Sequence, residues 1–191
     1  MKKIHLLAAL LFATGCAFAQ TKWAVDPVHS RIGFSATHMV VAEVEGYFKD
    51  FTATVNSKTD DFSGADVEFT AKTASVFTDN EKRDNHLKSD DFFNAEKFPE
   101  LKFIGSLIKD GGKYLLKGNL TIRDVTKPVT FEVTYNGRIK AFGGERAGFK
   151  LMGKINRKDY GLKFDKALEG GGLIVSDDIG INCKIELNKA A

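Results

Sequence analysis

The chain has 191 residues, of which 43% are hydrophobic and 28% are charged, and its formal net charge is +3. This composition is that of an ordinary globular protein and excludes a disordered or fibrous chain, while the length predicts one domain with at most a removable segment. No cluster of Lys and Arg alternates with aromatic residues, so the sequence carries no sign of a nucleic-acid-binding surface.

Residues 1–19 have the order of a secretory signal peptide. Lys2 and Lys3 precede an apolar run over residues 4–13, and Ala17-Phe18-Ala19 supplies small residues at the cleavage positions. We therefore predict cleavage before Gln20 and a periplasmic or secreted domain over residues 20–191. The alternative is a lipoprotein, because Ala13-Thr14-Gly15-Cys16 resembles a lipoprotein cleavage box in which Cys16 carries the anchor.

Apolar and polar residues alternate through most of the remaining chain, which is typical of strands with one buried and one wet face. The alternation covers residues 23–36, 44–55, 65–71, 101–107, 114–122, 129–135, 149–155 and 179–187. These runs predict an antiparallel sheet of about eight strands. Asp110-Gly111-Gly112 predicts a turn, and we place another at Gly143-Gly144 although Asn136-Gly137 is also a strong turn signal.

The apolar faces of these strands have only one another to pack against. A two-sheet sandwich would bury them, but a sheet that closes on itself also removes its edges. The sequence therefore favours a barrel. An eight-stranded barrel is either filled by its own side chains or holds one small ligand, and the periodicity does not choose between these two cases.

A charged segment, residues 76–100, interrupts the early strands and is called the lid segment below. Thr78-Asp79-Asn80-Glu81 fits a capping box at the start of a helix. The large apolar side chains of the segment are Leu87, Phe92, Phe93 and Phe98. The segment is either a solvated connection or a helical lid over the mouth of the barrel.

Several short motifs occur in a specific order along residues 23–161. They are Trp23-Ala24-Val25-Asp26-Pro27, His29-Ser30, His38-Met39, Gly46-Tyr47-Phe48, Asp84, His86-Leu87, Phe92-Phe93, Phe98-Pro99, Gly118-Asn119-Leu120-Thr121-Ile122, Val125-Thr126-Lys127-Pro128-Val129 and Asn156-Arg157-Lys158-Asp159-Tyr160-Gly161. With these motifs the chain resembles the YceI-like family of exported proteins that bind polyisoprenoid lipids. The resemblance implies a mainly all-β fold, an eight-stranded antiparallel lipocalin-like barrel with a helical lid segment. It also implies an isoprenoid or long-chain lipid ligand and a homodimer.

Phenylalanine is unusually frequent, with 16 residues. Six lie on the apolar faces of different predicted strands: Phe34, Phe48, Phe69, Phe103, Phe131 and Phe149. They are either core or the lining of an apolar tunnel, and we predict a tunnel because small residues share their faces. These small residues are Gly46, Ala65, Ala71, Gly105, Gly118 and Gly153, which we expect to leave room inside the barrel.

Four polar residues are candidates for binding a lipid head group at the mouth. His38 has the same parity as Phe34, which places it at an inner rim, while Arg83 and His86 belong to the lid segment. Arg157 points outward by parity but lies where a barrel end is expected. The alternative for the lid residues is a solvated surface with local ion pairs.

Metal binding and catalysis find no support in the sequence. His29 and His38 are nine positions apart, so a regular strand points them to opposite faces, and no zinc-ligand spacing is present. We expect Asp26 and His29 to satisfy backbone groups instead. No nucleophile elbow or phosphate loop occurs either, so we expect a protein that is not an enzyme and needs no cofactor.

Two functions follow. The first is a carrier, scavenger or store that holds a lipid in the barrel, with transient membrane contact. The second is a filled barrel that serves as a stress or protein-interaction module.

Cys183 alternates with Ile181 and Ile185, so we expect a buried thiol that reacts slowly.

Overall fold

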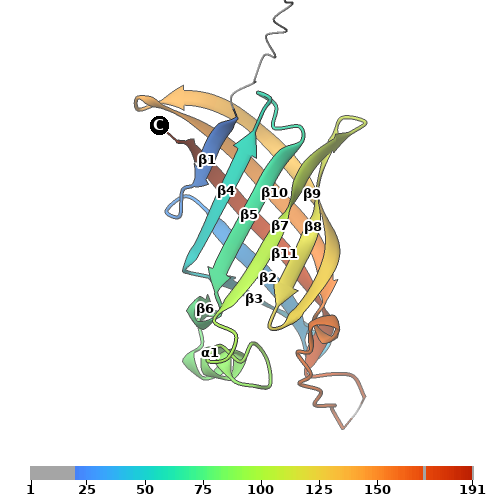
Figure 1. Ribbon diagram of the computed structural model, residues 1–191. Helices are drawn as coiled ribbons and strands as arrows, with labels where there is room; N and C mark the ends of the chain where they lie inside the picture. Colours follow the sequence, from blue (N-terminus) through green and yellow to red (C-terminus); the bar gives the residue numbers. More distant parts are fainter. Residues whose placement is uncertain (1–19, 170, 191) are drawn as a thin grey trace, which may run out of the picture.

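A computed structural model describes residues 20–169 and 171–190. The predicted signal peptide and Cys16 lie outside these residues. The described chain forms a closed antiparallel barrel with one α-helix, α1 (Glu81–Lys88), between early strands, which confirms the predicted fold class (Figure 1). Within this part of the chain, no helix is both long and apolar enough to cross a membrane.

The strands account for most of the chain. They are β1 (Thr21–Val25), β2 (Arg31–His38), β3 (Ala42–Phe48), β4 (Phe51–Ser57), β5 (Ala65–Lys72), β6 (Val76–Phe77), β7 (Glu100–Asp110), β8 (Lys113–Ile122), β9 (Val125–Ala141), β10 (Gly144–Asn156) and β11 (Val175–Lys189). Two short 3-10 helices, η1 (Thr73–Ser75) and η2 (Arg157–Tyr160), complete the set.

The ring closes in the order β1-β4-β5-β7-β8-β9-β10-β11, with β11 pairing back to β1. β11 pairs with β1 near its C-terminal end and with β2 over its earlier residues. On their other side, β1 pairs with β4 and β2 pairs with β3. β1 and β2 therefore form one kinked strand of the ring, and β3 and β4 form another. The sequence predicted these pairs as two uninterrupted runs. The first run is broken because Asp26 accepts hydrogen bonds from the backbone N–H groups of Val28 and His29, which turns the chain.

The hairpin turns use residues with positive φ. Gly111 and Gly112 form the predicted β7–β8 turn, with φ of 54° and 87°. The β9–β10 turn consists of Phe142 and Gly143, one residue before the predicted position, because Gly144 already pairs with Ala141. Asn136-Gly137 is not a turn: the register shifts at this point and the two residues form a bulge in β9.

One end of the barrel is closed by aromatic side chains and is called the closed end. Phe62 is buried at this end, and its ring centroid lies 5.0 Å from that of Trp23 and 5.1 Å from that of Phe149. Tyr135 stacks on Phe149 at 5.0 Å, and the Tyr114 hydroxyl donates to the Asp61 carbonyl. The beginning of β1, the end of β11 and the β9–β10 hairpin lie on this side (Figure 1).

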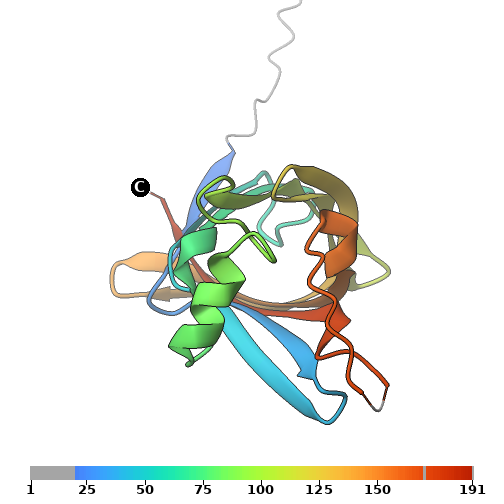
Figure 2. The same cartoon turned by 90° about the horizontal axis from the view of Figure 1, so that it is seen from below.

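The opposite end is flanked by α1 and by residues 157–169 and 171–174, together called the 157–174 segment, and forms the mouth (Figure 2). The predicted capping box is wrong, because the N-cap of α1 is Asn80, whose side chain accepts from the Arg83 N–H. Thr78 does not cap the helix but binds the side chain of Asp84. Its hydroxyl and its N–H both donate to the buried carboxylate of Asp84, which needs such donors because it is removed from water.

Candidate binding cavity

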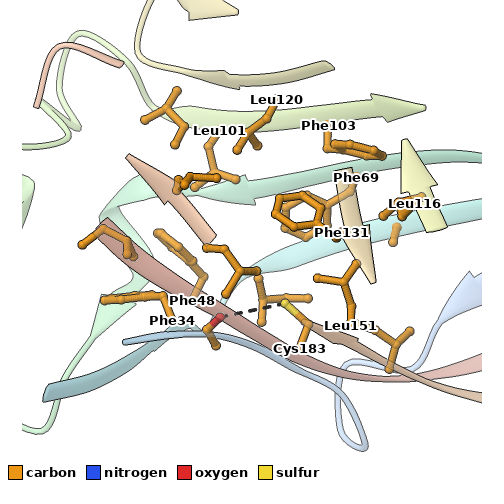
Figure 3. A pocket seen from close by; sticks show the side chains of 18 of the residues that line it. Phe34, Phe48, Phe69, Leu101, Phe103, Leu116, Leu120, Phe131, Leu151 and Cys183 are labelled. Atoms are coloured by element: carbon orange, nitrogen blue, oxygen red, sulfur yellow. Dashed lines mark hydrogen bonds between the residues drawn. The ribbon is translucent and has the colours of Figure 1, made fainter. Parts of the chain in front are cut away.

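The barrel encloses a cavity of about 260 Å³ between the closed end and the mouth. Its walls are formed by residues of β2, β3, β4, β5, β7, β8, β9, β10 and β11. The lid segment and the 157–174 segment contribute further lining residues. Figure 3 shows side chains from opposite walls pointing toward the same space. The volume lies just below the roughly 300–1,000 Å³ of common ligand pockets.

All six predicted phenylalanines line this cavity. They are Phe34, Phe48, Phe69, Phe103, Phe131 and Phe149. The lid segment adds Leu87, Phe92 and Phe93, and the Phe93 ring lies 5.6 Å from that of Phe48. Their inward orientation agrees with the strand parity, and their contact with a ligand stays a prediction.

The small inward residues do not create the cavity, contrary to our expectation. None of the six lines it, because aromatic rings fill the space beside the glycines. A Cβ atom at Gly46 would lie 2.5 Å from the Phe34 ring, and one at Gly153 would lie 2.5 Å from the Phe131 ring. Gly46 pairs directly with Phe34 on the adjacent strand, so this ring packs onto the glycine.

Gly118 shows the same packing more tightly. A Cβ at this position would lie 2.6 Å from both the Gly105 Cα and the Phe103 ring. The free space is instead bounded by Ala36 and Ala53, together with branched aliphatic side chains on the other walls. Sequence periodicity identifies which side chains point inward but not which of them leave a gap.

The cavity lining is almost entirely hydrocarbon. On β11 the lining residues run from Val175 to Leu187, which corresponds to roughly 40 Å of strand at about 3.3 Å per residue. The lining extends from Phe149 at the closed end to Arg157 at the mouth, and such an apolar space suits an extended hydrocarbon chain better than a compact polar molecule. Among the described residues, the one charged side chain in the lining is Arg157.

Three of the four predicted head-group residues do not line the cavity. His38 ends β2, two residues beyond the lining residue Ala36. The Arg83 guanidinium turns back and donates to the Thr78 carbonyl at 2.6 Å and to the Thr78 hydroxyl at 2.7 Å. His86 lies at the mouth, where its Nε2 is 2.7 Å from the Asp91 carboxylate. Their role toward a head group stays a prediction.

Arg157 is buried at the mouth, so the outward orientation predicted from parity is wrong. The reason is that β10 ends at Asn156, and Arg157 belongs to η2, where strand parity no longer applies. Its guanidinium donates to the carbonyls of Leu162, Ser176 and Val175 and to the Asp177 carboxylate, at 2.8 to 3.4 Å. Four of its five N–H groups are therefore engaged within the protein, and burial lowers its pKa.

The two sides of the mouth are joined by residues that sequence reasoning missed. The Phe164 ring lies 4.9 Å from His86 and 5.3 Å from Phe92, so it bridges the 157–174 segment and the lid segment. Arg123, in the β8–β9 turn, donates to the carbonyls of Phe92 and Gly161. These residues are far apart in sequence and have no periodic relation, so no local signal predicts their contact.

A cluster of Asp26, His29 and Glu186 lies outside the barrel wall, with ligand atoms within 4.8 Å of one another. Arg146 Nη1 is 2.8 Å from Glu186 and 3.6 Å from Asp26, so a protein cation already compensates these carboxylates. The hydrogen bond from His29 is the largest cause that lowers the pKa of Asp26 to about 2. The prediction that Asp26 satisfies backbone N–H groups is confirmed. The His29 ring instead lies with its Nδ1 3.1 Å from the Asp26 carboxylate. His38 ends a different strand.

Cys183 lines the cavity wall and is buried, as its alternation with Ile181 predicted. Burial raises the pKa of its thiol to about 12, and its Sγ lies 3.9 Å from the Gly33 carbonyl. Its thiolate population at neutral pH is therefore about a thousandfold below that of a thiol with the ordinary value of 9.0.

This burial predicts slow thiol chemistry. In a Cys16→Ser variant at pH 8, we expect Cys183 to react with a charged maleimide about a thousandfold more slowly in the native protein than in urea. The matched control is Lys184→Cys in a variant that also carries Cys16→Ser and Cys183→Ala. That thiol is on the exposed face of the same strand and should react rapidly. Rapid labelling of native Cys183 would contradict its burial.

The model of the YceI-like domain matches residues 23–187. A UPF0312 protein of Staphylococcus aureus is 35% identical over 170 residues, which cover 88% of this chain and 98% of that protein.

Solved structures of similar proteins have the same fold. A Campylobacter jejuni YceI protein is 34% identical, with a TM-score of 0.71 over 81% of this chain and 90% of its own. A polyisoprenoid binding domain from Saccharophagus degradans has a TM-score of 0.63 over 88% of this chain and 98% of its own. Its sequence identity is 12%, so this second likeness concerns the fold alone.

Proposed function

The chain belongs to the YceI-like family, and from this premise we propose that its barrel binds a polyisoprenoid or similar long-chain lipid. The observation that carries the proposal is the enclosed apolar cavity, which runs along the barrel axis and whose mouth lies between two joined segments. One protein of this fold is a polyisoprenoid binding domain, which makes this ligand class the first to test here. The protein would act as a carrier, scavenger or store of this lipid.

The driving force for binding would be burial of the hydrocarbon chain. Each Å² of apolar surface removed from water contributes about 25 cal/mol, less the cost of ordering the chain. Flat phenylalanine rings on opposite walls accommodate methyl branches without any hydrogen bond. A carboxylate or phosphate would be costly inside such a cavity, so the head group would remain at the mouth.

The second candidate, a filled barrel that acts as a stress or interaction module, does not fit the cavity of about 260 Å³. A binding protein rather than an enzyme is supported by the family and by the hydrocarbon lining, which offers a bound chain no nucleophile of ordinary reactivity. We also propose export through cleavage before Gln20, with the Cys16 lipoprotein as the alternative, and a homodimer in solution.

The test is a ligand analysis followed by a binding measurement. An organic extract of the protein purified from its own organism should contain a polyisoprenoid-tailed lipid by mass spectrometry. The delipidated protein should bind dansyl-labelled farnesol, with a rise in fluorescence. At about a hundred times Kd the probe should stabilise the fold by about 2.7 kcal/mol, which corresponds to a Tm increase of roughly 5–11 °C. An extract without lipid, together with no binding of the probe, would overturn the proposal.

A further inference from the structure

The turn between β2 and β3 exposes three consecutive apolar side chains, which we call the apolar tip. These are Met39, Val40 and Val41, whose exposed fractions are 42%, 66% and 88%. The other large apolar residues that are exposed in the described chain, such as Val28 and Ile104, are not consecutive with one another. Isolated exposed apolar residues are common on protein surfaces, whereas a contiguous group is unusual.

The backbone of the tip makes this choice of residues costly for folding. Met39 and Val40 have φ of 49° and 67°, and the Val41 N–H donates to the His38 carbonyl to close the turn. Asn and Gly are the residues that favour these angles, while a β-branched side chain such as Val is among the least suited. The fold alone would be better served by polar residues at the tip, so the apolar side chains call for an interaction outside the domain.

The tip lies at the mouth and not at the closed end. His38, directly before it, pairs with Val175, a residue of the cavity lining. The Met39 N–H donates to the Ile174 carbonyl, and Val40 lies against Gly172 of the 157–174 segment. Figure 2, which looks at this end of the barrel, shows the β2–β3 hairpin reaching outward beside this segment.

We propose that the apolar tip inserts into a lipid bilayer and docks the mouth of the barrel on the membrane surface. The inference rests on the proposed function, because a protein that binds a hydrocarbon chain must receive it from, or return it to, a lipid phase. Insertion would bury the three side chains at the level of the acyl boundary. The exposed Lys163 and Lys166, on the adjacent 157–174 segment, would then lie at the level of the lipid head groups.

A bilayer fits the tip better than a protein partner does. Three side chains on a projecting turn supply only a small part of the roughly 1,200–2,000 Å² that a stable protein interface buries. Along β3 the exposed apolar run soon ends, since Glu43 and Glu45 follow with exposed side chains. A short apolar projection is enough for a reversible membrane contact, which a carrier needs in order to leave again.

The test separates folding from membrane binding. In the variant Met39→Asn/Val40→Gly, the new residues suit the positive φ, so the Tm should stay the same or rise. Flotation with vesicles of phosphatidylcholine and phosphatidylglycerol should fall at least about tenfold, because the inserting side chains are gone. The rate at which dansyl-labelled farnesol moves from these vesicles into the protein should fall with it.

The β9–β10 turn provides a matched control. Phe142 is 97% exposed, has φ of 50° and is followed by Gly143, but lies at the closed end. Phe142→Asn should therefore have the same effect on Tm and leave vesicle binding unchanged. Equal flotation of the wild type and the tip variant, or equal loss in the Phe142 variant, would overturn the inference.

A second measurement keeps this inference distinct from the proposed function. Dansyl-labelled farnesol added without vesicles should bind the wild type and both variants equally, because the tip does not line the cavity. If the probe does not bind any of them while flotation still depends on the tip, membrane docking stands and the proposed function fails. If the probe binds but the wild type does not float with vesicles, the proposed function stands and membrane docking fails.

Discussion

Ala53→Trp is expected to abolish binding of dansyl-labelled farnesol, lowering affinity at least about a hundredfold, the equivalent of about 2.7 kcal/mol. Ala53 is a small residue on β4 that lines the free space, and an indole at this position would occupy the volume that the hydrocarbon chain needs. Because the added side chain enters empty space, the delipidated protein should keep its stability or gain about 0.5–2 kcal/mol. Fluorescence titration and urea unfolding measure the two effects.

The matched control for this substitution is Thr52→Trp, which adds the same side chain to the outer face of the same strand. Its affinity for the probe should equal that of the wild type. A loss of about 1–3 kcal/mol in Ala53→Trp with unchanged binding would mean that the site is packed and that the lipid binds elsewhere. Gly118→Leu is a poor substitute for this test, because even its Cβ would collide with the backbone of Gly105.

The strands and their inward faces could be predicted because a strand repeats every two residues, and each apolar face must be buried. Phe103 and Phe131 were therefore assigned to the interior without any knowledge of their neighbours. The same period could not reveal that the first two runs are kinked, because a kink depends on side-chain hydrogen bonds such as those of Asp26. Nor could it assign Arg157, which lies just beyond the end of a strand.

The cavity was predicted for a reason that the structure does not support. Small residues on the inner face suggested free space, but a glycine opposite a phenylalanine is the site on which that ring packs, as Gly46 and Phe34 show. Whether a barrel is hollow depends on the sum of side-chain volumes across walls that are far apart in sequence. The closed end depends likewise on Phe62, a loop residue that no repeating pattern includes.

Arg157→Leu is expected to destabilise the protein by about 3–5 kcal/mol, because several poorly exposed carbonyls would each lose a donor at a cost of about 1–3 kcal/mol. The side chain of Arg157 is 3% exposed, and it holds η2 to the beginning of β11 through the carbonyls of Val175 and Ser176 and the Asp177 carboxylate. It also donates to the Leu162 carbonyl. Leucine would leave these buried acceptors without donors. For a domain of this size, the Tm should fall by roughly 6–20 °C.

The neighbouring Lys158 is the matched control for Arg157, because it carries the same charge on a much more exposed side chain. It pairs with Asp165 and with the same Asp177, but its side chain is 36% exposed, so Lys158→Leu should cost less than about 1 kcal/mol. Arg157→Lys should fall between the two, because one ammonium cannot reach all four acceptors in place of the planar guanidinium. Since Arg157 anchors the 157–174 segment, its loss should also speed probe exchange through the mouth. Equal Tm changes in the Arg157→Leu and Lys158→Leu variants would show that the buried hydrogen bonds do not hold the mouth together.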